Sequence, residues 1–193
     1  MFRTSSEKKG EKERVRAALL RAALRLGAVH GFASLGLREV AREAGIAPTS
    51  FYRHFADMQE LGATLSSELV GAAITEVCQA LRSSEGPVAQ VLWDAMFAAS
   101  VRDPELMRFF VAERVGASAS LRASLQGQLA SLAKQLEPAS AAADAAVVLL
   151  IDASARALDE PEAQRAALRE SCEWAIARLL SASAPTQSGK VES

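Results

Sequence analysis

Residues 37–55 read LREVAREAGIAPTSFYRHF, and this stretch decides how the whole chain is interpreted. Its first half places apolar residues at i, i+3, i+4 and i+7 from Leu37, the spacing of one face of a helix. Gly45 closes that pattern, because glycine readily adopts the left-handed conformation that ends many helices. Pro48 can then open a second helix, since the first turn needs no N–H from it. Two short helices joined by a tight turn predict a helix-turn-helix, whose second helix points its N-terminal residues into the major groove of DNA.

The second helix of this motif carries the candidate DNA contacts. Hydroxyls, a tyrosine and cations suit phosphate oxygens and base edges, and here they are Thr49, Ser50, Tyr52, Arg53 and His54. On the residues alone, Tyr52 could equally be an ordinary hydrogen-bonded surface tyrosine. Phe51 and Phe55 are expected to pack in a small core rather than to meet DNA.

Upstream of the motif, apolar residues recur at helical spacing from Val15 to Val29 and predict a first helix that ends at His30. Residues 1–10 show no apolar period and are expected to form a mobile basic arm. Residues 1–60 contain eleven Lys and Arg against seven Asp and Glu, whereas the rest contain eleven against sixteen. A basic end suits a polyanion, although so small a difference is also common on ordinary helix surfaces. Lys12 is a further candidate contact with phosphates.

Six further helices are predicted downstream. The first is opened by an acidic form of the capping box at Asp57 and Glu60 and runs to about Leu81. The others begin at Pro87 and at Asp103-Pro104, or cover about residues 118–136, 141–158 and 161–181. No repeat or strand pattern is found, so we expect an all-α chain of about nine helices. The expected domains are a DNA-binding helix-turn-helix domain over 1–56, an effector-binding and dimerisation domain over 57–182, and a flexible tail over 183–193.

The composition is typical of a globular helical protein. Half of the 193 residues are apolar, and only 5% are aromatic, which favours helices over strands. Cys78 and Cys172 lie on apolar helical stripes and are expected to be small buried residues rather than metal ligands or a disulfide. The N-terminus has no apolar signal core, and the longest apolar run, Ala145 to Ile151, is too short to span a bilayer. A soluble, cytoplasmic protein without membrane contact is the expectation.

The helix-turn-helix residues, together with Gly31-Phe32, closely resemble the TetR family of bacterial repressors. In that family, contacts with phosphates or bases are made by the residues that match Thr49, Ser50, Tyr52 and His54. The residue matching Arg38 lies near the DNA backbone. Two positions depart from the pattern: Gly36 stands where a Ser or Thr cap is usual, and Met58 stands where a phosphate-binding Lys is common. The resemblance implies a homodimeric repressor that binds double-stranded operator DNA.

The two helices after Pro87 and Asp103 are apolar on more than one face, so they must be enclosed. They could fill a core or line a pocket. Residues 38–54, Glu60-Leu61-Gly62 and the run from Glu113 to Ser118 resemble the FabR/DesT branch of the family, which controls unsaturated fatty-acid synthesis. Ala112 departs from an Arg of that branch. The resemblance implies no cofactor but a hydrophobic effector of the long-chain acyl-CoA or fatty-acid type.

An acyl chain would need an apolar tunnel. The candidate lining residues are Trp93, Met96, Phe97, Phe109 and Phe110. Arg114 could bind a carbonyl or phosphate at the mouth of such a tunnel, or it could fix the helix through an ion pair with an acid such as Glu113 or Asp94.

The last two predicted helices carry more apolar surface than one chain needs. Two such helices from each of two chains would make a four-helix interface with two-fold symmetry, which the family resemblance also implies. The dimer would place two recognition helices about 34 Å apart on a palindrome.

Three other functions compete with this interpretation. An enzyme is disfavoured because the sequence has no nucleophile elbow, phosphate loop or metal-spaced His/Cys set. A TetR-type repressor of efflux or catabolic genes, with a different hydrophobic effector, would have the same sequence features. A helical lipid-binding adaptor that does not bind DNA would have the same apolar C-terminal part.

Overall fold

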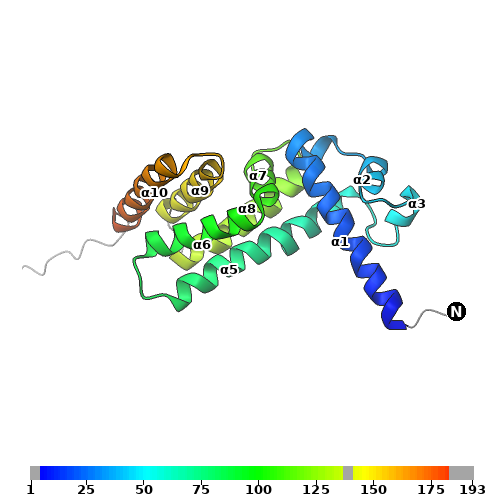
Figure 1. The fold of residues 1–193 in the computed structure, drawn as a ribbon, viewed down its shortest axis with the longest axis horizontal. Helices are drawn as coiled ribbons and strands as arrows, with labels where there is room; N and C mark the ends of the chain where they lie inside the picture. Colours follow the sequence, from blue (N-terminus) through cyan, green and yellow to red (C-terminus); the bar gives the residue numbers. More distant parts are fainter. Residues whose placement is uncertain (1–4, 137–140, 183–193) are drawn as a thin grey trace, which may run out of the picture.

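In the computed structural model, which describes residues 5–136 and 141–182, the chain is helical throughout and contains no strand in those ranges (Figure 1). Helix α4 continues directly into η2, a π-helical segment, and then into α5, so the described residues form about nine separate helices besides one 3-10 turn, as predicted. The elements are α1 (Ser5–His30), η1 (Phe32–Ser34), α2 (Leu37–Glu43), α3 (Pro48–Phe51), α4 (Met58–Thr64), η2 (Leu65–Val70), α5 (Gly71–Ser83), α6 (Val88–Arg102), α7 (Pro104–Glu113), α8 (Ala119–Leu136), α9 (Ala141–Ala157) and α10 (Glu162–Ala182).

Two of the predicted helix starts are capped by the expected side chains. The Asp57 carboxylate accepts a hydrogen bond of 2.8 Å from the N–H of Glu60, while the Glu60 carboxylate accepts one of 2.5 Å from the N–H of Ala56. The Asp103 carboxylate accepts the N–H of Leu106 at 3.1 Å. The bonds to Asp57 and Asp103 satisfy N–H donors that would otherwise have no partner in the first turns of α4 and α7.

The predicted start of the first helix is wrong, because α1 already begins at Ser5. The segment lacks an apolar stripe, but it is rich in Glu, Lys and Arg, which are good helix formers. Glu11 and Arg14 also form an ion pair of 3.2 Å across one turn. Of the predicted basic arm, only residues 1–4 lie outside the described residues, as does the predicted tail over 183–193.

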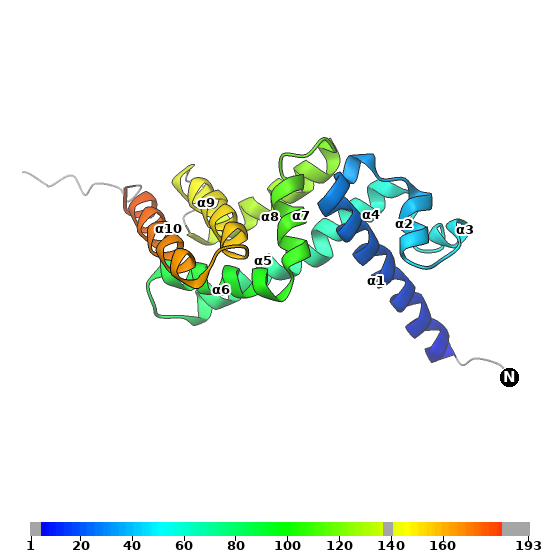
Figure 2. The same ribbon diagram turned by 45° about the horizontal axis from the view of Figure 1, so that its top comes forward.

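The molecule has two ends that differ in composition. We call α1 to α3 with η1 the head, and η2 to α10 the body. Figures 1 and 2 show α2 and α3 at one end and α9 and α10 at the other, with the long run from α4 to α5 connecting them. One apolar core is continuous through both parts, from Leu19 and Phe51 in the head to Trp93 and Ile176 in the body.

The cysteines are confirmed as buried, free residues of that core. Burial raises the pKa of Cys172 to about 11 and also raises the pKa of Cys78, so both remain thiols at neutral pH. Within the described ranges, no single helix is long and apolar enough to cross a membrane, whereas α8 and α9 taken together, as a sharply bent pair, meet the length and composition requirement.

Candidate DNA-binding face and effector cavity

The turn of the helix-turn-helix is built around Gly45. Its φ of 72° lies in the left-handed region. The N–H of Ile46 bonds to the carbonyl of Ala41 at 2.9 Å, and the N–H of Gly45 bonds to the carbonyl of Arg42 at 3.0 Å. This pair of bonds is a Schellman motif, which satisfies the last carbonyls of α2 and sends the chain into α3.

The second helix of the motif is shorter than predicted. Helix α3 ends at Phe51, and the next three residues form a tightened turn in which the N–H of His54 bonds to the carbonyl of Phe51 at 2.8 Å. The turn returns Phe55 to the interior, where its ring lies 5.8 Å from that of Phe51. Both rings are buried, which confirms the expected small core. Residues Tyr52 to His54 therefore project from a turn rather than from a helix.

Most predicted DNA contacts lie at the surface of the head. Four of them line one open groove between α1 and α3 of about 450 Å³, which the structure assembles from Lys12, Ser50, Arg53 and His54 together with Glu11, Val15 and Ile46. Arg38, Thr49 and Tyr52 are also exposed but lie outside this groove. Tyr52 is 65% exposed and meets the ring of Phe51 edge-on. The predicted contacts therefore surround the tip of α3.

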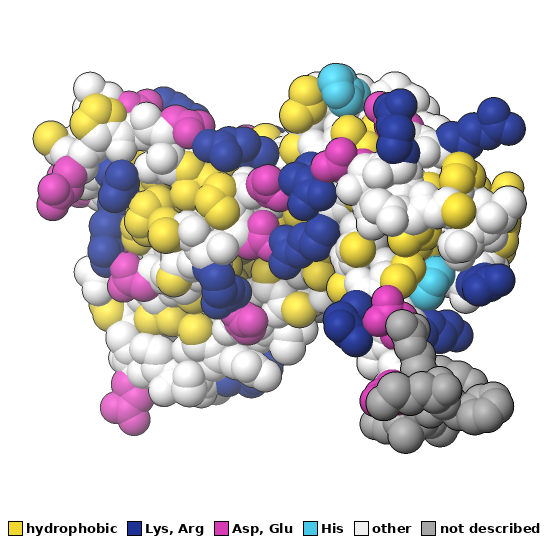
Figure 3. Space-filling model, turned by 45° about the vertical axis from the view of Figure 1, so that its right-hand side comes forward, with side chains coloured by type: hydrophobic (Ala, Val, Ile, Leu, Met, Phe, Trp, Pro, Cys, Tyr) yellow, Lys and Arg dark blue, Asp and Glu magenta, His cyan; other side chains and the backbone are white. Residues whose placement is uncertain are grey.

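The cations of the head fall into two groups. Arg16, Arg21 and Arg25 are held by Glu68, Asp103 and Glu43 respectively. In contrast, the cations Lys12, Arg38 and Arg53 form no ion pair with any residue in the described part of the chain. Figure 3 shows Lys and Arg side chains distributed around the head. The cations near the tip of α3 are thus available to an external anion.

His54 is the titratable group of this face. Burial lowers its pKa, and the neighbouring cations Lys12, Arg16 and Arg53 lower it further. Its Nδ1 atom is buried and has no hydrogen-bond partner among the described residues. His54 is therefore neutral at pH 7 in the free protein and can gain a proton if a negative charge comes close.

The body contains a small apolar cavity enclosed by the end of η2 and by α5, α6 and α7. Its volume is about 20 Å³, which is room for about one water molecule. Two of the predicted tunnel residues, Met96 and Phe110, contribute to its wall. The lining residues are Val70, Ala73, Ile74, Met96, Ala99, Asp103, Leu106, Met107 and Phe110.

The other three candidates, Trp93, Phe97 and Phe109, are not in the wall of this cavity. Phe109 packs against α1 at Gly27, so closely that a Cβ added to Gly27 would lie 2.6 Å from its ring. The ring also meets that of Phe32 edge-on, with 6.3 Å between the centroids. Trp93 stacks on Phe97 at 5.8 Å, beneath Arg165 of α10. Phe109 and Phe110 of α7 point in different directions, as do Met96 and Phe97 of α6, because successive helix positions differ by about 100°.

Arg114 forms an ion pair, but with a different acid from the two named as examples. Its guanidinium bonds to Asp152 of α9 at 2.6 Å and is not part of the cavity wall. The side chain of Glu113 is buried and accepts the N–H of Phe32 at 2.8 Å, while Asp94 pairs with Arg169 of α10 at 2.9 Å. Seven of the nine lining residues were not predicted. Asp103 is the polar one among them, and its position before Pro104 indicated only a helix cap.

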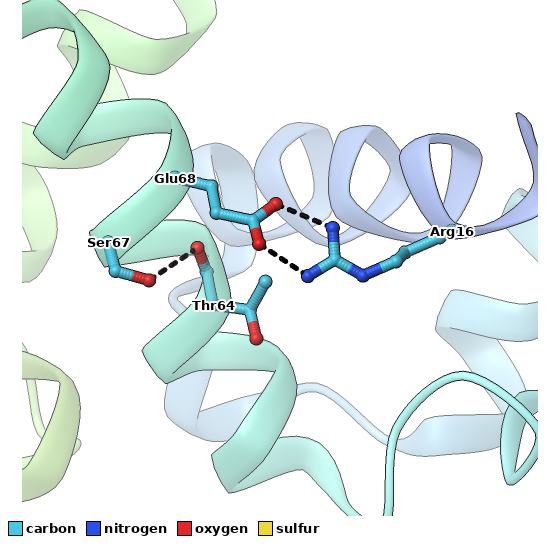
Figure 4. A network of polar contacts seen from close by, with 4 residues as sticks. All are labelled: Arg16, Thr64, Ser67 and Glu68. Atoms are coloured by element: carbon cyan, nitrogen blue, oxygen red, sulfur yellow. Dashed lines mark hydrogen bonds and ion pairs between the residues drawn. The ribbon is translucent and has the colours of Figure 1, made fainter. Parts of the chain in front are cut away.

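Polar contacts tie the head to the body on both sides of the cavity. Arg16 of α1 and Glu68 of η2 form a two-pronged ion pair with distances of 2.5 and 2.6 Å (Figure 4). Arg21 of α1 pairs with Asp103 at the α6–α7 corner. A change in the cavity wall therefore has a short physical route to α1.

The outer surface of α10 exposes a large apolar side chain. Trp174 is 67% exposed and lies in an open surface depression with Ala175, Arg178, Leu179, Ser181 and Ala182. Only Cys172 and Ile176 of this 21-residue helix are fully buried in the chain. An exposed aromatic in a helix with so little of its surface covered is typical of an interface with another chain.

Comparisons with known proteins agree with this geometry. Residues 19–63, from the middle of α1 to the end of α4, match the family profile described as bacterial regulatory proteins, tetR family. The fold resembles that of a TetR-family transcription regulator from Shewanella sp. PV-4, with 23% identity over 87% of this chain and 97% of the other and a TM-score of 0.65. It also resembles the fatty acid degradation regulator FadR from Bacillus halodurans (16% identity, 86% and 94% coverage, TM-score 0.64). A third similar structure is the multidrug binding protein EbrR complexed with imidazole (21% identity, 85% and 93% coverage, TM-score 0.62).

The helix-turn-helix geometry, the profile match and the structural matches together support one assignment for the head and for the overall architecture. Residues 19–63 match the N-terminal domain profile of the TetR family, and the chain as a whole has a TetR-like fold with a helix-turn-helix head and a helical body.

Proposed function

We propose that this chain is a ligand-responsive transcription repressor that binds palindromic operator DNA as a homodimer. The observation that carries the proposal is the tip of the head, where Lys12, Arg38 and Arg53 have no ion-pair partner among the described residues and Tyr52 is exposed beside a braced turn. Phosphates attract such cations, and base edges accept or donate hydrogen bonds to the hydroxyls of Thr49 and Ser50.

The dimer would form through α9 and α10. Burial of Trp174 and the small side chains around it removes apolar surface from water, and a two-fold axis repeats the contact on both chains. Two heads related by such an axis can read two half-sites about 34 Å apart.

The effector would be a hydrophobic small molecule that opens the cavity beside Met96 and Phe110. A long-chain acyl-CoA or fatty acid is the class that the sequence resemblance implies, and the apolar wall suits its chain. Regulation of fatty-acid or lipid genes would follow from that effector. A repressor of efflux or catabolic genes with another apolar effector is the second candidate, favoured by the small volume of the cavity.

Regulation then follows as linkage between two sites. An effector that binds one dimer conformation better than the other shifts the population, and a coupling of about 1–3 kcal/mol suffices. The ion pairs Arg16–Glu68 and Arg21–Asp103 are the contacts through which the cavity wall can act on α1.

Gel-shift titrations against the DNA that flanks the coding sequence test the proposal. We expect a discrete complex whose affinity falls steeply with salt, and an affinity at least about tenfold lower for Tyr52→Ala, because a hydrogen bond to a charged group contributes about 1.5–3 kcal/mol. Trp174→Glu should convert a dimer to monomers in analytical ultracentrifugation. A protein that forms no operator complex at any ionic strength would be a helical adaptor instead.

A further inference from the structure

The side chain of Glu113, at the end of α7, makes a buried polar contact with the head. It is only 3% exposed, and its Oε1 atom accepts the N–H of Phe32 at 2.8 Å. Phe32 begins η1, the short turn between α1 and α2, so this bond joins the body to the backbone just before the helix-turn-helix. The contact therefore holds main-chain atoms of the head, whereas the ion pairs between α1 and the body hold only the ends of long, partly exposed side chains.

Two glycines permit this contact. Gly31, directly after α1, has a φ of 79°, a backbone conformation that glycine adopts without steric cost, and it turns the chain into η1. In the loop after α7, a Cβ added to Gly116 would lie 2.5 Å from Oε2 of Glu113. A side chain at either position would therefore disturb the bond between Glu113 and Phe32.

The ring of Phe32 is held as well as its N–H. It meets the ring of Phe109 in α7 edge-on, and a Cβ added to Gly62 of α4 would lie 2.8 Å from it. Phe32 thus contacts α7 through both its backbone and its side chain. Since α2 begins at Leu37, only five residues later, the position of Phe32 constrains the orientation of the helix-turn-helix.

Burial of the Glu113 carboxylate costs free energy that a neutral acceptor would not. Glu113 belongs to none of the ion pairs within residues 5–136 and 141–182, and its Oε2 atom has no hydrogen-bond partner in those ranges. A buried charge without an opposite charge is destabilising. A charged acceptor, however, forms a hydrogen bond roughly twice as strong as a neutral one. The carboxylate therefore lowers the stability of this region but connects α7 firmly to the head.

We propose that Glu113 is a positioning residue that sets the separation of half-sites which the dimer accepts. This inference rests on the proposed function and specifies how the operator is selected. In the proposed dimer the bodies meet through α9 and α10, so the connection between each head and its own body determines where the two recognition helices lie. A firm connection keeps them at one separation, whereas a loose connection lets them adapt to several.

Duplexes with an altered centre measure this selectivity. The palindrome found by gel shift is compared with versions that carry one base pair more or one fewer between the half-sites, which changes their separation by about 3.4 Å and their relative direction by about 35°. The wild type should bind both altered duplexes at least about tenfold more weakly than the palindrome, whereas for Glu113→Ala the difference should shrink to less than about threefold.

A duplex with a single half-site separates positioning from a general loss of stability. The wild type and Glu113→Ala should bind it with affinities that agree within about twofold, because the surface of the head that meets DNA is distant from Glu113. A variant that is merely less folded would bind the half-site and the palindrome more weakly by the same factor.

Further variants keep the test independent of any folding defect in Glu113→Ala. Gly116→Ala retains the carboxylate but forces it away from the N–H of Phe32, so it should relax the spacing preference in the same way. Glu113→Gln keeps an acceptor oxygen and should retain most of the preference. The matched controls are Gly127→Ala, where a Cβ meets no atom within 4 Å, and Glu105→Ala, at an exposed acid of α7. Both controls should behave like the wild type.

Amide hydrogen exchange followed by NMR tests the contact without DNA. The amide of Phe32 should exchange at least about tenfold faster in Glu113→Ala and Gly116→Ala than in the wild type. The inference is overturned if this rate is unchanged, if both variants keep the spacing preference of the wild type, or if half-site binding falls as much as palindrome binding. Failure of the proposed function looks different: the wild type then forms no complex with any duplex although the exchange rate still responds, and the inference falls with it.

Discussion

The tip of the head and the cavity of the body use charge in opposite ways. At the tip, Lys12, Arg38 and Arg53 have no acidic partner in the described part of the chain, whereas the cavity carboxylate Asp103 is already paired with Arg21. A site for a polyanion gains affinity by keeping its cations free, because each new phosphate contact releases counterions. The internal pair instead joins α1 to the α6–α7 corner and so contributes to holding the head on the body.

The largest effect is expected where the two regions meet. Phe109→Ala should lower the free energy of unfolding by about 3–5 kcal/mol, because the ring is fully buried between α1 and α7. Urea unfolding followed by circular dichroism measures this loss. Val115→Ala, at an apolar residue that is 73% exposed just after the same helix, should stay within about 0.5 kcal/mol. A loss below 1 kcal/mol for Phe109→Ala would mean that head and body are not coupled through this ring.

A change at the turn of the head tests whether the tip needs its backbone conformation. Gly45→Val should destabilise the protein by about 1–2 kcal/mol and reduce operator binding, since a β-branched residue is strained at a φ of 72°. Gly45→Asn is the control, because Asn tolerates the left-handed region and a Cβ at this position meets no atom within 4 Å. Equal operator affinities for the Val and Asn variants would show that the turn does not position α3.

Gly45 and Phe109 also show which parts of the molecule the sequence could predict. Gly45, Pro48 and the caps at Asp57 and Asp103 act on neighbouring residues, so the boundaries of most helices and the helix-turn-helix followed from local patterns. The location of the Phe109 side chain could not be predicted from local patterns. Phe109 and Phe110 are both apolar, and only the tertiary packing decides which of them faces α1.

The same limit applies to charges that pair over long sequence distances. Asp152 lies 38 residues from its partner Arg114, and Asp103 lies 82 residues from Arg21, so neither pair has a local signal. The early start of α1 was missed for a different reason. The apolar period that predicts amphipathic helices is absent where a helix has no core to cover, although Glu and Lys still favour the helical conformation.

Paired and unpaired cations of the head should respond differently when they are removed. Arg53→Gln should lower the slope of operator affinity against salt by about 1, because one phosphate contact is lost. Arg25→Gln removes a cation that is held by Glu43 at 3.0 Å and should change the slope much less. Gel shifts at several salt concentrations provide both slopes. If the two variants have the same slope, pairing does not decide which cations reach DNA.

The smallest expected effect is a pH dependence due to His54, which has opposite signs for the stability of the free protein and for operator affinity. Because burial and nearby cations lower the pKa of His54 from its ordinary value of 6.5, the folded protein binds this proton less well than the unfolded chain. The contribution of His54 therefore makes the free protein less stable as the pH falls below about 6.5. A phosphate beside His54 favours the charged form instead, so operator affinity should rise by a few fold as the pH falls over the same range. His54→Gln should remove the pH dependence of both stability and operator affinity. If the operator affinity of the wild type falls with falling pH relative to that of this variant, His54 does not lie beside the phosphates.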